Sequence, residues 1–404
     1  MASIDAELLH GCLGLAARRV RPYDVLMTKR ILLLLALAGL MAACSGKNGA
    51  LPATTASSGP SPTATDATAA TAGTAVESAS PAYWPTDGWR TSDPASQGMD
   101  PAKINAAFES VAKQNLGLHG VVVIRHGYIV SEKYYGRYSA DSADEIYSCT
   151  KSFTSALIGI AIGKGFIKDV QQPVLGFFRN MGFAQVDARK QAMKLEDLLT
   201  MSSGLGWVEG DATYRDMYVS SRNWVRYVLD LPMVAAPGQA FNYSSGNSHV
   251  LAAIIQARTG KSTAEFARTS LFDPIGIRNP RWDTDPSGIP IGGWGLKLSA
   301  RDMAKLGFLY LHRGVWDGKQ VVPASWVSVS TTPHIMANGT WSYGYQWWID
   351  ESVPMYAAQG RFGQAIFVVP GKDLVVSFTA QIESGDSEAS LVKNYFLPAC
   401  KTGT

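Results

Sequence analysis

The sequence predicts an α+β fold in which helices flank an antiparallel sheet and a mostly helical subdomain is inserted at about 166–290. Two observations carry this prediction. Strand-like segments bounded by Gly, Pro and Asp lie near both ends of the folded part, at 120–130 and at 343–379. The stretch between them consists mostly of helical segments and loops. Strands that are separated from helices along a chain are typical of the α+β class.

Composition limits the possible functions. The chain has 404 residues, 46% of them hydrophobic, and 11 tryptophans, which supports a large packed core. Its net charge of +3 favours neither a nucleic acid nor an acidic ligand. The four cysteines and the scattered histidines have no metal-ligand spacing, so we expect no metal and no cofactor. Cys149 and Cys400 would pair only if the fold brought them together, and we expect Cys149 to be a buried thiol.

Residues 1–44 indicate an upstream extension followed by a signal peptide, with either Met1 or Met27 as the true start. A basic stretch precedes an apolar run of about 13 residues, shorter than the roughly 20 needed to span a bilayer. The run ends at Cys44 in a sequence that resembles a bacterial lipobox, so Cys44 is a candidate for lipidation. The alternative is cleavage after a small residue. We therefore expect a cell-envelope protein that is lipid-anchored, periplasmic or secreted.

Residues 45–92 form a predicted disordered linker, and residues 93–404 a predicted single folded domain. Gly46 to Pro81 consists largely of Ala, Thr, Ser, Gly and Pro, and such a segment cannot bury enough apolar surface to fold. A flexible tether after a lipid anchor would hold a folded domain away from a membrane. Within the end of this segment, Trp84 to Trp89 indicate where the folded chain begins.

The elements follow in order. Asp100 and Pro101 are an N-cap and a first helical residue, so a helix is expected from Pro101 to about Lys113. Two strands joined by Arg125-His126-Gly127 form a hairpin signal. Later helices are expected at 195–199, 224–231, 248–258, 262–271, 299–311 and 387–396, and later strands at 343–348, 364–369 and 374–379.

The segment around Ser148 carries the first chemical signal. A polar stretch ends at Phe153, and the almost wholly apolar Thr154 to Gly163 predicts a buried helix with Ser148 at its first turn. Positions three apart share one helix face, so Lys151 would point at the same place as the Ser148 hydroxyl. A serine needs a base or a cation to become a nucleophile, and free N–H groups at a helix start favour an oxyanion. The same spacing at Ser110 lies in an amphipathic helix and indicates only a surface lysine.

Two later clusters carry further candidates. Tyr243 and Ser245 precede an apolar helix, and a tyrosine acts as a base only where a nearby cation holds its phenolate. Taken alone, Tyr243 indicates a half-buried loop residue. Gln359, Gly360 and Arg361 lead into an apolar strand, and the glycine allows a backbone to approach a ligand closely. Taken alone, this segment indicates an ordinary turn before a strand.

Together the three clusters resemble the penicillin-recognising serine hydrolases, specifically the class C β-lactamase-like group with its esterases, D-aminopeptidases and 6-aminohexanoate-dimer hydrolases. The family pattern is Ser-x-x-Lys, then Tyr-x-Asn or Tyr-Ser-x, then Lys/His-x-Gly on a strand. The resemblance covers about 95–400 and looks closest to the 6-aminohexanoate-dimer hydrolase and esterase branch. It extends to flanking segments at 198–204, 298–303, 343–348 and 363–370. It implies a β-lactamase/transpeptidase-like fold.

The resemblance also implies roles for individual residues. Ser148 is the nucleophile, and Lys151 either keeps Tyr243 anionic or itself accepts the serine proton. Tyr243 passes a proton to the leaving group. The backbone N–H groups of Ser148 and Arg361 form the oxyanion hole, and losing one such donor costs roughly 3 kcal/mol of transition-state stabilisation. Weaker candidates for substrate contacts are Ser245, Gln359, Gly360, Asp211, Tyr214, Tyr218, Trp294 and Trp347.

Two departures from the family pattern bear on the substrate. Ser245 stands where many relatives have Asn, which changes the expected contact with a substrate amide. Ala358 stands where β-lactamases and D,D-peptidases have a cation that holds a substrate carboxylate. That absence favours an esterase or amidase, although the side-chain direction of Arg361 is open at this stage. There is no Gly-x-Ser-x-Gly elbow, which argues against the common α/β-hydrolase triad.

Three hypotheses follow. The leading one is a serine hydrolase that forms an acyl-enzyme on small amides or esters. The second is a β-lactamase or D,D-peptidase, and the third is a non-catalytic binding module of the cell envelope. The presence of all three of Ser148, Lys151 and Tyr243 favours an enzyme over a binding module. The expected partner is a small-molecule amide or ester, with a membrane reached only through a lipid anchor, and no nucleic acid or protein partner is implied.

Overall fold

The structure is a computed structural model that describes residues 81–383 and 387–401. The predicted signal peptide, Cys44 and most of the predicted linker lie outside these residues. The ring centroids of Trp84 and Trp89 lie 5.8 and 5.5 Å from that of Phe308, so both indole rings pack on the folded domain. In the described part of the chain, every helix is too short or too polar to cross a membrane.

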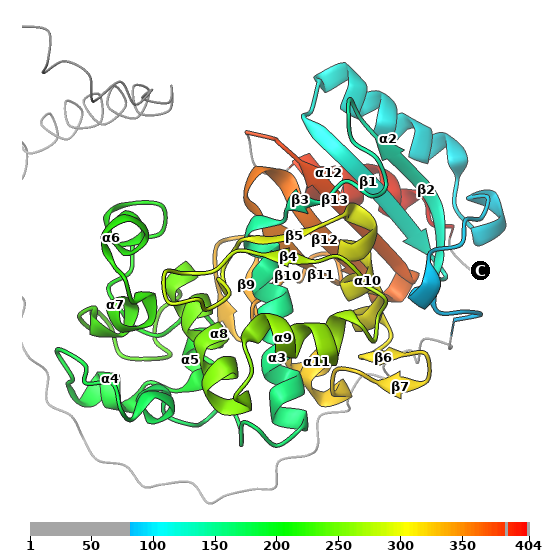
Figure 1. The fold of residues 1–404 in the computed structure, drawn as a ribbon. Helices are drawn as coiled ribbons and strands as arrows, with labels where there is room; N and C mark the ends of the chain where they lie inside the picture. The colour runs from blue at the N-terminus through cyan, green and yellow to red at the C-terminus, as the bar shows by residue number, and fades with distance from the viewer. Residues whose placement is uncertain (1–80, 384–386, 402–404) are drawn as a thin grey trace, which may run out of the picture. The chain divides into compact units, whose positions relative to one another are not determined.

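The main sheet is antiparallel and has eight strands in the order β2-β1-β13-β12-β11-β10-β9-β8 (Figure 1). Strand β1 pairs with both β2 and β13, so the first and last strands of the sequence meet in one sheet, as predicted. The strands are β1 (Leu118–Arg125), β2 (Tyr128–Tyr134), β8 (Ile335–Met336), β9 (Ser342–Tyr343), β10 (Trp348–Asp350), β11 (Met355–Gly360), β12 (Gln364–Val369) and β13 (Leu374–Ala380).

Two small sheets complete the strands. One joins β3 (Asp144–Glu145), β5 (Leu296–Leu298) and β4 (Arg281–Trp282) in the order β3-β5-β4, and the other pairs β6 (Val315–Trp316) with β7 (Lys319–Gln320). The first of them matters for function, because β3 leads directly to Ser148. The N–H of Ile146 donates to the carbonyl of Leu296 at 2.9 Å. This bond fixes the approach to the predicted nucleophile.

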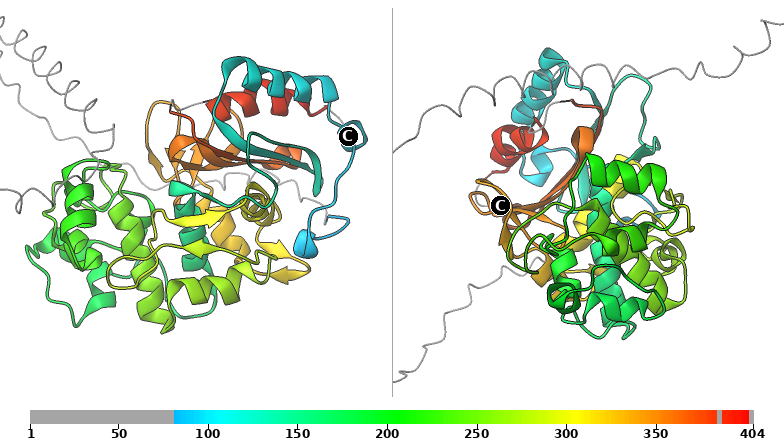
Figure 2. Two further views of the ribbon diagram at one scale, coloured as in Figure 1. Left: turned by 45° about the horizontal axis from the view of Figure 1, so that its top comes forward. Right: turned by 90° about the vertical axis from the view of Figure 1, so that its left-hand side faces the viewer.

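Helices cover both faces of the main sheet (Figure 2). Alternate residues of β1 enter different cores, because successive side chains of a strand point to opposite faces. Val121 and Val123 pack with the first helix and the C-terminal helices, whereas Val122 and Ile124 pack with the buried helices of the other face. The first face carries α2 (Pro101–Gln114), α12 (Ser387–Leu391) and α13 (Leu397–Ala399), and the second carries α3 (Thr150–Gly163) and α10 (Ala300–Leu311).

The remaining helices lie mostly in the segment predicted as a helical insert. They are α4 (Ala188–Ala192), α5 (Leu195–Leu199), α6 (Ala212–Ser220), α7 (Trp224–Asp230), α8 (Ser245–Thr259), α9 (Thr263–Ala267) and, beyond the insert, α11 (Ala324–Ser330). Short 3₁₀ turns occupy η1 (Pro85–Asp87), η2 (Ala95–Gln97), η3 (Tyr147–Cys149), η4 (Val174–Phe178), η6 (Arg361–Gly363) and η7 (Pro370–Lys372), and π turns occupy η5 (Arg268–Phe272) and η8 (Val392–Phe396).

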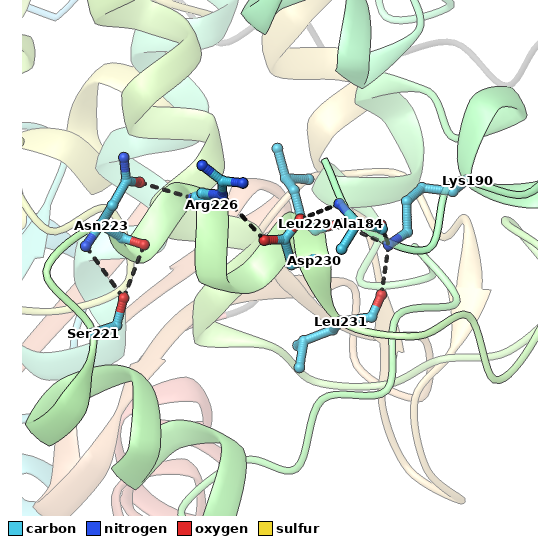
Figure 3. A network of polar contacts seen from close by, with 8 residues as sticks. All are labelled: Ala184, Lys190, Ser221, Asn223, Arg226, Leu229, Asp230 and Leu231. Atoms are coloured by element: carbon cyan, nitrogen blue, oxygen red, sulfur yellow. Dashed lines mark hydrogen bonds and ion pairs between the residues drawn. The ribbon is translucent and has the colours of Figure 1, made fainter. Parts of the chain in front are cut away.

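Lys190 fastens α4 to the end of α7 inside this insert (Figure 3). Its side chain is buried, and Nζ donates to the carbonyls of Ala184, Leu229 and Leu231 at 3.2, 2.8 and 2.7 Å. Asp230 accepts from the N–H of Ala184 at 2.6 Å. An ammonium at the last carbonyls of a helix opposes the negative end of its dipole. One lysine thus satisfies three backbone acceptors where the insert folds back on itself.

The predicted strand at 343–348 is wrong in its middle. Gln346 has a φ of 64°, which breaks the segment into β9 and β10. Its side-chain amide donates to the carbonyl of Leu199 at 2.8 Å and accepts from the hydroxyl of Ser248 at 2.6 Å. Ser152 in α3 donates to the Gln346 carbonyl at 2.7 Å. These buried bonds tie the sheet to α3, α5 and α8, and they outweigh the cost of the left-handed backbone.

Candidate active site

Ser148 lies in the 3₁₀ turn η3, immediately before the buried helix α3. This agrees with the expected position at the start of a buried helix. The residue before it, Tyr147, has a φ of 44°, a left-handed conformation that is rare for a large side chain and that clusters at functional sites. Cys149 is a free, buried thiol, as expected, and its Sγ donates to the carbonyl of Gln364 at 3.3 Å. Cys400 is also free, so the two cysteines do not pair.

Lys151 is the centre of the site. Its Nζ lies 2.9 Å from Ser148 Oγ, 3.0 Å from Ser245 Oγ and 2.9 Å from the carbonyl of Gly293. The side chain is buried, and loss of hydration lowers the pKa of Lys151 from 10.5 to about 8, opposed by the negative charge of Glu209. With this pKa about a tenth of Lys151 is the neutral amine at pH 7 and about half at pH 8, and the neutral amine has a lone pair free to accept a proton from Ser148.

Tyr243 completes the trio. Its side chain hydrogen-bonds Ser148, and its ring centroid lies 4.9 Å from Lys151 Nζ. Trp348 stacks on the same ring at 5.6 Å, with the two ring planes 27° apart. Loss of hydration raises the pKa of Tyr243 above its usual value of 10, so the phenol is protonated at neutral pH. Of the two alternatives for activating Ser148, this favours Lys151 as the base and Tyr243 as a proton donor.

The end of β11 runs against the turn that holds Ser148. A Cβ added to Gly360 would lie 2.5 Å from the carbonyl oxygen of Ile146 and 3.2 Å from the amide nitrogen of Ser148. Only glycine allows so close an approach of the two backbones. Gly360 therefore brings the start of η6, and with it the amide of Arg361, beside the amide of Ser148. Two neighbouring N–H groups are the arrangement that an oxyanion hole requires.

Ser245 is a correction to the predicted substrate contacts. It is buried, and its hydroxyl accepts from Lys151 and donates to Glu209 Oε1 at 2.6 Å. The Ser245 amide and the indole N–H of Trp207 both donate to Glu209 Oε2, at 2.8 and 2.6 Å. Ser245 is thus committed to a network that ends at Glu209. Sequence reasoning missed Glu209 because a single glutamate in a loop has no motif around it.

Sequence reasoning also missed a buried pair, His249 and Asp285, near the Lys151 site. His249, in the second turn of α8, contacts Asp285 through Nε2 and Oδ2 at 3.1 Å, and both side chains are fully buried. Asp285 Oδ1 accepts from the N–H groups of Ser287 and Ile289 at 2.8 and 2.9 Å. This pair fastens to α8 the loop that supplies the Gly293 carbonyl for Lys151. Hydrogen bonds to the carboxylate, led by His249, hold the pKa of Asp285 below its usual value despite burial.

The other predicted contacts divide into two groups. Trp347 is fully buried, with its ring 4.6 Å from Tyr310 and 5.4 Å from Tyr356, so the expectation that it lines the site is wrong. The neighbouring side chain, Trp348, is the first residue of β10 and stacks on Tyr243 instead. Gln359 is half-buried at the end of β11, and its amide nitrogen is buried without a partner among the described residues.

An aromatic cluster adjoins the site. The ring of Trp294, the residue after Gly293, lies 5.1 Å from Tyr214 and 5.6 Å from Trp224. Tyr218 closes the cluster at 6.4 Å from Tyr214 and 5.6 Å from Trp224, and its side chain is 57% exposed. The predicted Tyr214, Tyr218 and Trp294 are therefore brought together, whereas Asp211 is exposed at the start of α6.

A polar cavity of about 430 Å³ lies elsewhere, between η1 and the start of α10. Its lining includes Asp87, Arg278, Ser299 and Lys305. Lys305 is already bonded to Asp302 at 3.1 Å and to the carbonyl of Gly276. None of the predicted catalytic residues lines this cavity, so it is separate from the site around Ser148.

A buried lysine that contacts a serine at the start of a helix, beside a tyrosine and the end of an antiparallel sheet, defines a serine hydrolase of the β-lactamase fold. The chain belongs to the beta-lactamase family, whose pattern its residues 104–396 match.

Individual relatives agree with this assignment. Over 283 residues the chain is 24% identical to the 6-aminohexanoate-dimer hydrolase of Paenarthrobacter ureafaciens, which covers 63% of this chain and 70% of that protein. An octameric penicillin-binding protein homologue from Pyrococcus abyssi has a similar fold, with a TM-score of 0.60, 21% identity and coverage of 74% and 78%. A family VIII carboxylesterase has a TM-score of 0.62, 14% identity and coverage of 76% and 99%.

Proposed function

We propose that the protein hydrolyses small amides or esters through an acyl-enzyme on Ser148, in the manner of 6-aminohexanoate-dimer hydrolases and related esterases. The contact between Lys151 Nζ and Ser148 Oγ carries this proposal. Lys151 is buried, has a lowered pKa and is aimed at the serine by fixed partners. The buried Lys190 donates only to backbone carbonyls, whereas Lys151 contacts a serine hydroxyl, and a buried group with a shifted pKa beside a nucleophile is typical of catalytic sites.

Acylation begins on the neutral amine of Lys151. It accepts the proton of Ser148 while Oγ attacks the substrate carbonyl carbon and the carbonyl π pair moves to oxygen. The amides of Ser148 and Arg361 bind that oxyanion. As the intermediate collapses, Tyr243 gives its proton to the leaving nitrogen or oxygen, and the carbon–nitrogen or carbon–oxygen bond breaks. The Lys151 ammonium then returns a proton to Tyr243.

Deacylation repeats the same steps with water. A water molecule attacks the Ser148 ester, its proton passes to Lys151, and the second oxyanion occupies the same amides. Collapse releases the acid and returns the proton to Ser148 Oγ. Ser245 and Glu209 contribute to both acylation and deacylation, because they hold the Lys151 amine in place and adjust its pKa.

The segment at the end of β11, from Ala358 to Arg361, favours ester or amide hydrolysis over β-lactam hydrolysis. Ala358 is buried within β11 and has no cationic side chain for a substrate carboxylate. The β-lactamase or D,D-peptidase hypothesis therefore has less support, and a non-catalytic module has no need of the Ser148, Lys151 and Tyr243 constellation. Lipidation of Cys44, and with it a place in the cell envelope, remains part of the proposal.

The test is intact-mass analysis after incubation with a fluorophosphonate probe and, separately, with penicillin G, followed by peptide mapping. A fluorophosphonate adduct on Ser148 without a stable penicillin adduct is expected. A long-lived penicilloyl adduct on Ser148 would replace the proposal with a penicillin-binding function. No adduct with either reagent on correctly folded protein would leave the binding module as the better account.

A further inference from the structure

His119 joins the main sheet to the segment that leads to Ser148. Between Leu118 and Gly120 of β1, the partner strand β13 advances by a single residue, so His119 is the extra residue of a β-bulge. A bulge changes the direction of a side chain, and bulges are common next to active sites. The His119 side chain is 15% exposed, and its contacts are with residues that lie between β2 and Ser148.

Three contacts from His119 hold this segment. Its carbonyl accepts from the N–H of Tyr135 at 3.0 Å. Its ring lies flat on that of Tyr138, with the centroids 3.7 Å apart and the ring planes at 11°. Its Nδ1 lies 2.7 Å from Asp144 Oδ2, and since an ionised carboxylate only accepts, Nδ1 carries the donated proton. One residue of the sheet thus fixes the segment at its start, its middle and its end.

The carboxylate of Asp144 is held by His119 rather than by the cation nearby. Its side chain is 19% exposed, and within the described residues it forms an ion pair with His119 alone. Lys297, which lies in the neighbouring strand β5, instead contacts Asp283 at 2.6 Å. The next carboxylate in the chain, Glu145, lies near Lys297 and accepts from the backbone of Gly295. Asp144 is therefore committed to the histidine.

The position of Asp144 reaches Ser148 through a short, hydrogen-bonded path. Asp144 is the first residue of β3, and two residues later the N–H of Ile146 donates to the carbonyl of Leu296 at 2.9 Å. The carbonyl of Ile146 in turn accepts from the N–H of Cys149 at 3.1 Å. Ile146 is thus bonded on one side to β5 and on the other to the turn that contains Ser148.

The backbone around Ser148 leaves no room for a displacement of Ile146. A Cβ at Gly360 would lie 2.5 Å from the Ile146 carbonyl oxygen, so this oxygen packs directly against the strand end that brings in the second oxyanion amide. Tyr147, between Ile146 and Ser148, has the left-handed φ of 44°. A strained residue of this kind persists only where the structure on both sides holds it. Helix α3 holds one side, and β3 holds the other.

We propose that His119 and Asp144 are positioning residues for the nucleophile. Their contact fixes β3, and β3 fixes the turn in which the Ser148 hydroxyl faces Lys151 and the Ser148 amide faces the oxyanion. This inference rests on the proposed function and adds to it two residues that act on Ser148 through the backbone rather than through the substrate.

The direct measure of this effect is the second-order rate at which a fluorophosphonate probe labels Ser148, because labelling needs only the serine, its base and the oxyanion amides. In Asp144→Ala we expect this rate, and kcat for an ester, to fall by about 10-fold or more, since a small displacement of a reacting group has a cost of that order. KM should change little. His119→Ala should have the same effect, and the double variant should lose no more than either single variant.

Asp144→Asn is the conservative variant. Its side-chain oxygen still accepts from Nδ1 of His119, so labelling should return to within about 3-fold of the wild-type rate. Should Asp144→Ala fail to fold, Tyr138→Leu gives the same test at a half-buried position, because it removes only the ring that stacks on His119. A fall of about 3-fold in the labelling rate is expected there.

Two controls separate positioning from loss of charge and from loss of stability. Asp273→Ala removes an exposed carboxylate that bonds Arg268 at 2.9 Å, and the labelling rate should be unchanged. Lys190→Met removes three hydrogen bonds to backbone carbonyls in the helical insert, so thermal stability should fall while the folded protein keeps its labelling rate.

The outcomes distinguish this inference from the proposed function. Wild-type labelling rates in Asp144→Ala and His119→Ala, additive losses in the double variant, or no recovery in Asp144→Asn would overturn the positioning role while Ser148-dependent hydrolysis stood. An equal loss in Lys190→Met would overturn it too, because reduced stability would then explain both. If the wild type took no fluorophosphonate on Ser148, the proposed function itself would fall.

Discussion

The hydroxyl of Ser245 donates a 2.6 Å hydrogen bond to the carboxylate of Glu209 and accepts one from Lys151 at 3.0 Å. A serine thus bridges the predicted base and a carboxylate that lies 36 residues earlier in the chain. The negative charge of Glu209 raises the pKa of Lys151 and partly offsets the effect of burial. The position of the Lys151 titration near pH 8 is therefore the balance of these two opposing effects.

This balance predicts a pH dependence with a definite sign. Because Lys151 acts as the neutral amine, kcat/KM for ester hydrolysis should rise with pH. The rising limb of this pH profile should have an apparent pKa near 8, that of Lys151. In Glu209→Gln the charge that favours the ammonium is gone, so the pKa falls and the limb moves to lower pH. The measurement is kcat/KM from pH 5 to 9.5. Glu265→Gln, an exposed residue paired with Lys261, should leave the limb in place, and a limb that shifts upward in Glu209→Gln would contradict the assignment.

Ser148→Ala should abolish hydrolysis and labelling while the protein remains folded. Only one oxygen atom is lost at a half-buried position, so the free energy of unfolding should change little. A nucleophile of this kind accounts for a factor of about 10³ or more in kcat. Ester turnover and thermal unfolding, measured on the same preparation, check both points. Turnover at the wild-type rate in this variant would contradict the assignment of Ser148 as the nucleophile.

Tyr243→Phe should affect amides more than activated esters. The phenol is protonated and hydrogen-bonds Ser148, so its loss removes the proton for the leaving group. An amine must be protonated to leave, whereas 4-nitrophenolate leaves as an anion. We expect kcat for an anilide to fall by about 10² or more and kcat for the corresponding 4-nitrophenyl ester to fall much less. Equal losses on both substrates would point to positioning of Ser148 instead.

Asp285→Asn should lower kcat although Asp285 itself makes no contact with the substrate. The change keeps the shape of the side chain but removes the charge that pairs with His249, and this loosens the loop that holds the Gly293 carbonyl against Lys151. A small displacement of a catalytic group costs roughly 10–100-fold in rate. The predicted signature is a lower kcat with little change in KM. In a double-mutant cycle with His249→Gln, additive effects would show that the pair does not act as a unit.

Lys190→Met should reduce stability rather than catalysis. Methionine fills the space of the lysine stem but leaves the carbonyls of Ala184, Leu229 and Leu231 without their donor. Unsatisfied buried acceptors cost about 1–3 kcal/mol each before relaxation, so we expect the free energy of unfolding to fall by about 2–4 kcal/mol. Urea unfolding monitored by tryptophan fluorescence measures it. Lys168→Met, at an 83% exposed side chain, should cost almost nothing.

The sequence was sufficient for the fold class, an antiparallel sheet built from strands near both ends of the folded part, whereas the pairing of β1 with β13 was found only in the structure. Helix starts such as Asp100 with Pro101 were correct, because a cap is a local interaction between neighbouring residues. The Ser148 to Lys151 contact was also foreseeable, since three residues of helix fix that geometry. The split of 343–348 at Gln346 was not, because it depends on bonds to Leu199 and Ser248 that are far away in the sequence.

What the sequence determined by itself was therefore local: periodicity, caps and the spacing within a motif. Tertiary structure alone decided that Gly293 contacts Lys151, that Ser245 links Lys151 to Glu209, and that Trp348 rather than Trp347 reaches Tyr243. The physical reason is that the pKa of a buried group depends on every charge and dipole around it, whatever their distance along the chain. The directions of the two tryptophan side chains likewise depend on the break at Gln346, which is held by bonds to residues far away in the sequence.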